Sequence, residues 1–388
     1  MKRILAGGAI AILLILAAGL AFLPGVLESR INRVADHQPY AVPEAARTLH
    51  DGLAVVDLHA DTLLWARDPL ERSNRGHVDV PRLAEGNVTL QVFSAVTKVP
   101  RDQGYVGTSG DSDVITLLAM VQRWPARTWD SLLERALYQS EKLHDAERRA
   151  PEDLMIVRSA ADLDRLIKRR NGGSRPVGGL LATEGAHPLE GRLENIERLY
   201  EAGYRMMGIT HFFDNELGGS LHGLSGAGLT DFGRNAVREM ERLGIVIDLA
   251  HASPAVVRDT LDMATRPVVV SHTGIHGACD SPRNLEDALM KRIAEAGGLV
   301  GIGYWEGAAC GTSPAAVVKS IRYAVDFLGV DHVALGSDYD GAVPVAFDTS
   351  ELAVLTAGMR EAGFTDEEIG KVMGGNAIRF FRENLPQG

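Results

Sequence analysis

The stretch VVDLHADTLLW, residues 55–65, places an apolar run that begins at Val55 directly before two polar side chains, His59 and Asp61. Residues two apart in an extended chain point to the same side, so both side chains can reach one space at the end of a strand. The pair is typical either of two ligands of one metal ion or of a buried histidine that is hydrogen-bonded to an aspartate. This stretch alone leaves both interpretations open.

Seven further short, β-rich apolar runs follow along the chain. Together with the first, the predicted strands are residues 55–58, 89–94, 177–182, 205–209, 245–249, 267–270, 299–303 and 332–335. Amphipathic helical patterns separate most of these runs, which predicts an α/β protein with a parallel sheet covered by helices. Eight such units predict a (β/α)8 TIM-type barrel. A doubly wound open sheet is the alternative, although no glycine-rich phosphate motif follows the first strand.

Histidine or acidic side chains recur where the predicted strands end. In chain order they are His59 with Asp61, Glu184, His211, His251, His272 and Asp338. The carboxyl ends of barrel strands open onto one face, where active sites lie, and scattered structural histidines would not fall in step with them. Histidine and carboxylate ligands suit Zn²⁺. The set exceeds what one tetrahedral ion needs, so we expect two ions, a bridging carboxylate and hydrolysis by a bridging hydroxide.

Composition and the N-terminus set the remaining expectations. The 388 residues carry a formal net charge of −11, which argues against nucleic acid as a partner. Lys2 and Arg3 precede an uncharged apolar run, residues 4–27, that is long enough to span a bilayer as a helix. We therefore expect a single-pass anchor (1–27), a tether (28–45) and an extracytoplasmic catalytic barrel (46–388) with a helical insertion at about 100–170. A cleaved signal peptide, which would give a secreted protein, is the alternative.

Seven motifs resemble those of the membrane dipeptidase (renal dipeptidase) family of zinc peptidases, in the same order from about residue 50 to 380. They are VVDLHADT, ATEGAHPL, GITHFFDN, IDLAHAS, VVVSHTG, SPRNLED and LGSDYDG. The resemblance implies a (β/α)8 barrel with two Zn²⁺ ions that hydrolyses dipeptides, including those with a C-terminal D-residue. It also implies a homodimer as one form of assembly, and a disulfide between Cys279 and Cys310. The glycine-rich segment after His211 is unlike that of the mammalian enzymes, so their substrate preference cannot be carried over.

The resemblance also implies a role for each site residue. His59 and Asp61 would bind the first zinc, His251 and His272 the second, and Glu184 would bridge the two.

His211 would contact the substrate carbonyl and stabilise the oxyanion, and Asp338 would be the acid/base group. Arg283 would bind the terminal carboxylate of the substrate, unless it is an ordinary surface ion-pair residue. Tyr304 would help to hold that carboxylate or form only the pocket wall.

Two other functions remain open from the sequence. One is a different dinuclear amidohydrolase on the same barrel, such as a deacylase, a phosphotriesterase-like or a lactamase-like enzyme. Such enzymes usually begin with H-x-H, whereas this chain has H-x-D. The other is a catalytically inactive, tethered barrel, which would be expected to lack a metal ligand or Asp338.

Overall fold

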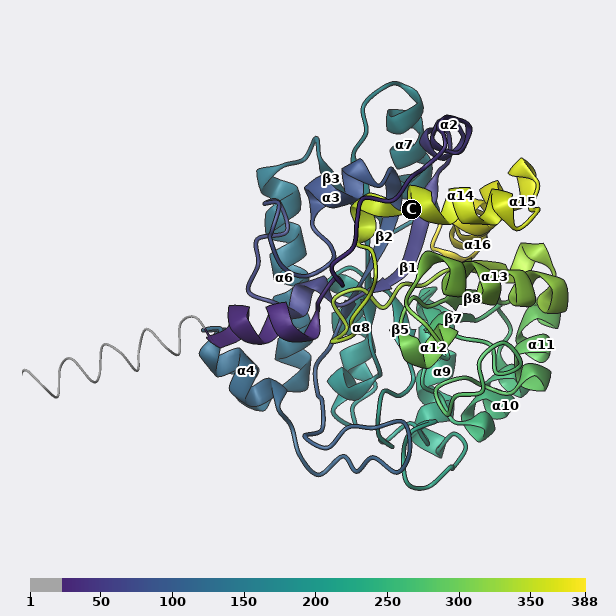
Figure 1. Ribbon diagram of the computed structural model, residues 1–388. Coiled ribbons are helices and arrows are strands. Elements are labelled where there is room, and N and C mark those ends of the chain that lie inside the picture. Colours follow the sequence, from purple (N-terminus) through teal and green to yellow (C-terminus); the bar gives the residue numbers. More distant parts are fainter. Residues whose placement is uncertain (1–22) are drawn as a thin grey trace, which may run out of the picture.

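The computed structural model describes residues 23–388, and its centre is a closed barrel of eight parallel strands (Figure 1). Neighbouring strands follow the order β2-β1-β9-β8-β7-β6-β5-β4, and β2 pairs with β4 to close the barrel. The strands are β1 (Val55–Ala60), β2 (Val88–Ala95), β4 (Val177–Thr183), β5 (Tyr204–Gly208), β6 (Val246–Asp248), β7 (Val269–Thr273), β8 (Leu299–Ile302) and β9 (Val333–Leu335). The predicted (β/α)8 TIM-type barrel is confirmed, and the closure rules out the open sheet.

A ninth strand, β3 (Leu154–Ile156), was absent from the sequence prediction. It pairs with the first half of β4, from Leu154 beside Val177 to Ile156 beside Gly179. The pairing of β5 with β4 begins only at Leu181, so β3 fills the edge that β5 leaves open. Three apolar residues inside a largely helical insertion are too short a run to show strand periodicity.

Helices surround the barrel and bury the outer faces of its strands (Figure 1). Several begin with a serine or threonine whose side chain accepts a backbone N–H, as Ser253 does before α10 and Thr230 before α9. The helices are α2 (Glu44–Asp51), α3 (Val80–Glu85), α4 (Ile115–Val121), α5 (Arg127–Asp130), α6 (Leu132–Arg149), α7 (Ala160–Asn171), α8 (Glu194–Glu201), α9 (Asp231–Leu243), α10 (Pro254–Met263), α11 (Asp287–Glu295), α12 (Glu306–Ala309), α13 (Pro314–Leu328), α14 (Ala353–Glu361), α15 (Asp366–Gly370) and α16 (Asn376–Asn384).

Glycine lets the end of β9 approach β7 closely. A Cβ atom on Gly336 would lie 1.9 Å from the carbonyl oxygen of Ser271, a distance that no side chain can occupy. Gly336 directly follows β9 and leads to Asp338, so this contact brings the predicted acid/base residue to the neighbourhood of His272.

The N-terminal segment contacts the barrel. Most of the predicted anchor, residues 1–22, lies outside the described residues. Residues 23–31 form a helix, called here the N-terminal helix, which packs beside α4 through Ile31 (Figure 1). Within residues 23–388, none of the helices combines the length and the apolar character that crossing a membrane requires.

Residues 28–45, predicted as a tether, also lie against the barrel. The carboxylate of Glu28 is buried and pairs with Arg67, and its second oxygen lies 2.7 Å from Nε of Arg75. Further along, the N–H of Ala35 donates to the carbonyl oxygen of Val345 at 2.8 Å. Both contacts fix the N-terminal helix to the face of the barrel at which the strands end.

The predicted disulfide between Cys279 and Cys310 is confirmed, with 5.5 Å between the two Cα atoms. It joins the loop that follows β7 to the end of α12, which follows β8. The β7 loop carries Arg283, so the disulfide restrains one predicted substrate-binding residue.

Candidate metal centre and active site

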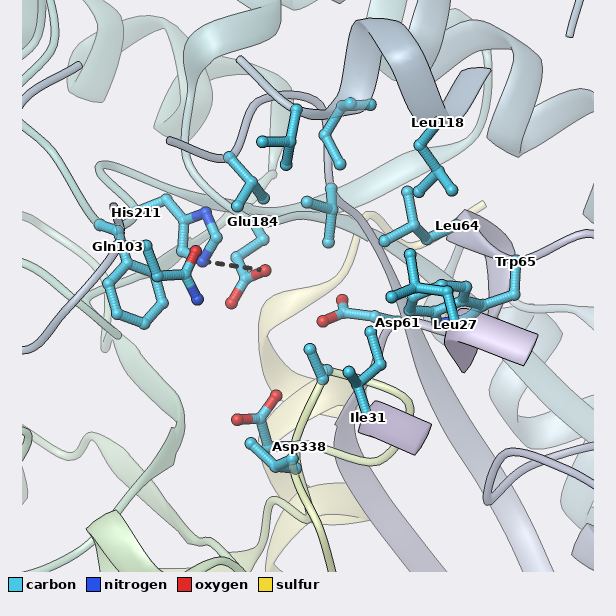
Figure 2. Close-up of a pocket in the computed structure, with 18 of the residues that line it drawn as sticks. Leu27, Ile31, Asp61, Leu64, Trp65, Gln103, Leu118, Glu184, His211 and Asp338 are labelled. Atoms are coloured by element: carbon cyan, nitrogen blue, oxygen red, sulfur yellow. Dashed lines mark ion pairs between the residues drawn. The ribbon is translucent and has the colours of Figure 1, made fainter. Parts of the chain in front are cut away.

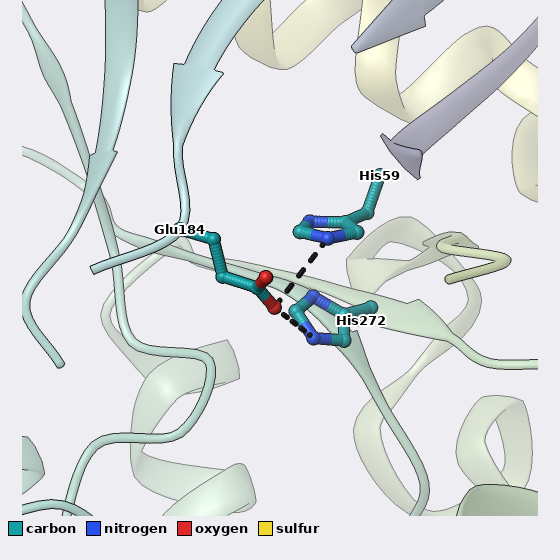
Figure 3. A group of neighbouring side chains, drawn as sticks. All are labelled: His59, Glu184 and His272. Atoms are coloured by element: carbon teal, nitrogen blue, oxygen red, sulfur yellow. Dashed lines mark ion pairs between the residues drawn. The ribbon is translucent and has the colours of Figure 1, made fainter. Parts of the chain in front are cut away.

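Four predicted metal ligands meet at one carboxylate oxygen. The ring nitrogens Nε2 of His59, His251 and His272 lie 3.6, 3.2 and 3.4 Å from Oε1 of Glu184. Figure 3 shows His59 and His272 approaching Glu184 from their strands. All four side chains are buried, so the strand ends bring the predicted ligands together as the barrel requires.

Two further carboxylates complete the cluster on the side of His59. Its Nε2 lies 3.3 Å from Oδ1 of Asp61 and 4.0 Å from Oδ1 of Asp338. On the opposite side, Nε2 of His211 lies 3.3 Å from Oε2 of Glu184. Three groups could each hold a metal ion, and within a group the candidate ligand atoms lie within 4.8 Å of one another: His59–Glu184–His272, Glu184–His211–His251 and His59–Asp61–Asp338.

Unusual backbone conformations aim two of these side chains. His251 and Asp338 have positive φ angles of 62° and 61°, in the left-handed region that residues other than glycine rarely adopt. Asp340 shares this conformation at 63° and points away from the cluster, toward Arg67, which lies 2.5 Å from its Oδ2. Such conformations are costly and persist where the surrounding structure fixes them, often at functional sites.

The protonation state of His251 follows from its partners. Nδ1 of His222 lies 3.1 Å from the carbonyl oxygen of Tyr105, and its Nε2 lies 3.0 Å from Nδ1 of His251. A carbonyl only accepts, so Nδ1–H of His222 donates and its Nε2 must accept from Nδ1–H of His251. Burial, aided by the charge of Arg283, lowers the pKa of His222 to about 3, which keeps its ring neutral. Nε2 of His251 is therefore left with a lone pair that faces Glu184.

The same reasoning applies to His272. The hydroxyl of Ser271 donates to Oδ2 of Asp248 at 2.5 Å, so its oxygen accepts from Nδ1–H of His272 at 2.9 Å. Nε2 of His272 also carries a lone pair, and it lies only 2.9 Å from Nε2 of His251. Burial holds the pKa of both histidines well below the ordinary value, which disfavours a proton between them. Two lone pairs and a carboxylate oxygen that converge in this way fit a metal cation.

Buried acid charge supports the same conclusion. Burial raises the pKa of Asp61 and of Glu184 well above the ordinary value, and the charge of a neighbouring aspartate adds to each shift. Burial also raises the pKa of Asp338 to about 8, although His59 opposes the shift. Arg283 offsets part of this cost for Glu184 and Asp338, but three clustered carboxylates are costly in a protein interior unless further cations bind to them.

Three residues outside the predicted set support the cluster: Asp57, Asp248 and His222. Asp57 accepts from the backbone N–H and the hydroxyl of Ser337 at 2.9 and 2.5 Å, which ties β1 to the segment before Asp338. Asp248 orients Ser271, as described above. Asp57 and Asp248 each interrupt an otherwise apolar strand. This was the available sequence signal, because a buried carboxylate needs partners. His222 gave no such signal, since it lies in an irregular loop.

Arg283 lies fully buried at the His251 end of the cluster. Its guanidinium donates to the carbonyl oxygen of His272 at 2.8 Å and lies 3.4 Å from Nε2 of His251. It lines the cavity that contains the metal centre and lies against the ring of Trp305. It is therefore not a surface ion-pair residue, and it presents a cation to any molecule bound beside the metal centre.

Tyr304 and His187 lie behind the site. The ring of Tyr304 is fully buried against Tyr339 and Phe347 and does not line the described cavity. His187 packs against Phe213, and burial, with the charge of Lys98, lowers its pKa to about 3. The substrate-binding role of Tyr304 stays a prediction, without a contact that places it near a substrate.

The cavity above the cluster has a volume of about 520 Å³ and is mostly apolar (Figure 2). Six of the residues already described line its polar end: Asp61, Glu184, His211, His251, Arg283 and Asp338. From Asp61 it continues between the N-terminal helix and α4. Nothing in the sequence motifs predicts that continuation, because the two helices come from segments about 90 residues apart.

Comparisons with known proteins agree with this site. A family model described as membrane dipeptidase (peptidase family M19) matches residues 43–386. The dipeptidase aclJ of Aspergillus oryzae is 27% identical over 350 residues, which cover 84% of this chain and 76% of that protein.

Two solved structures share the fold over most of the chain. A metallopeptidase from Rhodobacter sphaeroides, liganded with a phosphinate mimic of the dipeptide L-Ala-D-Ala, is 26% identical with a TM-score of 0.69, covering 86% of this chain and 99% of that one. Dipeptidase AC, a metallopeptidase of family M19, is 25% identical with a TM-score of 0.70, covering 87% and 99%. With candidate metal ligands gathered at the strand ends and a family model that spans nearly the whole barrel, the chain belongs to the membrane dipeptidase family, peptidase family M19.

Proposed function

We propose that this metallopeptidase holds two Zn²⁺ ions and hydrolyses dipeptides, including those with a C-terminal D-residue. The observation that carries the proposal is the 2.9 Å approach of Nε2 of His251 to Nε2 of His272, both facing Oε1 of Glu184. In the tautomers assigned above neither nitrogen carries a proton, so a bound cation would relieve the repulsion between their lone pairs.

The ligands divide into two sets around Glu184. His59 and Asp61 would hold one ion and His251 and His272 the other, with Glu184 contributing to both sites. Zinc bound there would lower the pKa of a water molecule and so supply a nucleophile near neutral pH.

Three other side chains act on the substrate in this proposal. His211 presents Nε2 beside Glu184, where a donor could stabilise negative charge on the scissile carbonyl oxygen. Asp338 lies beside His59 on the other side and would pass a proton to the departing amine. Arg283, with its planar fork, would bind the free carboxylate of the dipeptide.

Tolerance of a D-residue is proposed by analogy. The Rhodobacter sphaeroides relative carries a mimic of L-Ala-D-Ala. In this chain Arg283, carried by the loop after β7, would bind the carboxylate of a C-terminal residue of either configuration.

The experiment uses the full chain, purified in detergent and supplied with zinc. We expect two zinc ions per chain by mass spectrometry, and turnover of both L-Ala-D-Ala and L-Ala-L-Ala. Asp338→Asn should retain the zinc and lose turnover. Two zinc ions without turnover of any dipeptide would favour another amidohydrolase activity, and a zinc-free protein would remove the proposal.

We also propose that the chain is membrane-anchored with its catalytic barrel outside the cytoplasm. The apolar run of residues 4–27 supports an anchor, and so does the surface next to it. Within the described part of the chain, most exposed large apolar side chains lie on the N-terminal helix and at α4: Leu23, Val26, Leu27, Val114, Leu117 and Met120. A surface of this kind suits the boundary of a bilayer.

The location can be tested in cells. The full-length protein should stay in the membrane pellet after an alkaline carbonate wash and be cleaved by protease added outside spheroplasts. Release by the wash, or protection from external protease, would contradict the proposed location.

A further inference from the structure

The cavity extends beyond the metal centre in a direction that cleavage of a small dipeptide does not require. This extension, the apolar arm, runs from Asp61 between the N-terminal helix and α4 (Figure 2). Within residues 23–388, its walls are formed by the uncharged side chains of Leu27, Ile31, Leu64, Ile115, Leu118 and Val121. An uncharged, elongated space beside a cleavage site is suited to an apolar substituent of the substrate.

The N-terminal helix is a fixed wall of this arm. Glu28 is only 1% exposed and is held by Arg67 and Arg75. At the end of the helix, the side-chain oxygen of Asn32 accepts the backbone N–H of Ala342 at 2.8 Å. Ala342 lies in the loop that begins with Asp338, so the wall and the acid/base residue are held by one connected set of contacts.

The position of the arm decides which residue of a dipeptide it could hold. Arg283 lies at the His251 end of the metal centre, 3.4 Å from Nε2 of His251. The arm opens at the other end, beside Asp61. With its carboxylate on Arg283, a dipeptide that reaches across the metal centre would place its amino-terminal residue nearer Asp61, at the entrance of the arm.

We propose that the apolar arm is a subsite for a bulky, uncharged side chain, such as leucine or phenylalanine, on the amino-terminal residue of the substrate. The N-terminal helix is its specificity-determining wall. This inference rests on the proposed dipeptidase function. One methylene group in a hydrophobic pocket changes kcat/KM by about 10–200-fold, so selection by the arm should be readily measured.

The test compares L-Leu-D-Ala, L-Ala-D-Leu and L-Ala-D-Ala as substrates of the full-length, zinc-loaded protein in detergent. We expect kcat/KM for L-Leu-D-Ala to exceed that for each of the other two by at least about tenfold. Ile31→Ser should remove most of this advantage, because it lowers kcat/KM for L-Leu-D-Ala far more than for L-Ala-D-Ala. Arg30→Ser, at an exposed neighbouring position on the same helix, is the matched control and should change neither value.

Three outcomes would overturn the inference: equal rates for L-Leu-D-Ala and L-Ala-D-Ala, a preference that follows the carboxyl-terminal residue, or an equal loss on all substrates in Ile31→Ser. Leu118→Ser, on the opposite wall, repeats the test if Ile31→Ser does not fold.

A binding measurement tests the subsite even if the dipeptidase proposal fails. If no dipeptide is cleaved, calorimetry with phosphinate mimics of L-Leu-D-Ala and L-Ala-D-Ala measures the arm directly. Tighter binding of the leucine mimic, reduced in Ile31→Ser, supports the subsite, and equal binding of the two mimics removes it.

Discussion

Nε2 of His222 lies 3.0 Å from Nδ1 of His251 and accepts a hydrogen bond from its N–H, which leaves a lone pair on the opposite nitrogen of His251 for a metal ion. Removing the acceptor should let the ring rotate and change its tautomer. We predict that His222→Ala weakens zinc binding by about 10–100-fold, as loss of a residue that orients a metal ligand commonly does. Competition with a chelator of known affinity measures the change. His222→Gln, which offers an acceptor oxygen, should recover part of it, and equal zinc affinity in all three proteins would contradict the assigned tautomers.

Glu184 should make stability depend on the metal. Zinc that binds only the folded state at 100 times its Kd adds about 2.7 kcal/mol to the free energy of unfolding. We predict a loss of at least this size when a chelator removes zinc from the wild-type protein, measured by denaturant unfolding. Glu184→Gln removes the shared carboxylate and should abolish most of the difference between the zinc-loaded and the chelator-treated protein. A chelator effect of undiminished size in this variant would contradict a central role for Glu184.

Arg67 joins the N-terminal helix to the loop that carries Asp338, because it pairs with both Glu28 and Asp340 in the interior. Arg67→Met leaves Asp340 buried without its cationic partner, and removal of one member of a buried ion pair costs about 3–5 kcal/mol. We predict a loss of this size in the free energy of unfolding by urea. Arg47→Met, at an exposed position, is the control and should change the value by less than about 0.5 kcal/mol.

His77 should make stability fall in mild acid. Its Nδ1 accepts the backbone N–H of Asp340 at 2.9 Å, and burial lowers its pKa from 6.5 to about 4. The unfolded chain therefore takes up this proton at a higher pH than the folded chain. The stability from the neutral ring is present above pH 6.5 and is lost as the pH falls toward 4, by up to about 1.4 kcal/mol per pH unit.

A matched variant isolates the contribution of His77. The side-chain oxygen of His77→Asn can replace Nδ1 as the acceptor but does not titrate. Urea unfolding across this pH range should therefore give a shallower decline for the variant than for the wild-type protein. Parallel declines would assign the acid sensitivity to other groups.

The sequence predicted the barrel, and the structure brings the predicted metal ligands together, because both depend on local patterns. Apolar runs mark the strands, and residues such as Glu184 and His272 stand at the strand ends or directly after them. Closure of the barrel therefore brings these residues together on one face. No local pattern marks His222 as part of the site, since its partner His251 lies 29 residues away across an irregular loop. Strand β3 was not predicted, because a run of three residues is too short to show the two-residue periodicity of a strand.

The N-terminal helix illustrates a second limit of local patterns. The sequence of apolar residues is the same whether the side chains face lipid or line a cavity, so the pattern predicts a membrane segment in both cases. The contact of Asn32 with Ala342 joins residues 310 positions apart, and no periodicity or motif reports such a pairing. The acidic Glu28 was the one available hint, because a carboxylate that interrupts apolar sequence needs a cation if it is buried.

The attachment of Glu28 to Arg67 bears on how the enzyme is produced and assayed. A recombinant fragment limited to the family-matched region, residues 43–386, would retain every metal ligand and could pass as an intact catalyst. It would lack the N-terminal helix, which is one wall of the apolar arm. Arg67 would also lose Glu28, one of its two counter-ions. Substrate profiles from such a fragment would describe an enzyme that is less selective than the native chain, and inhibitors screened on it would be optimised against a surface that the N-terminal helix normally covers.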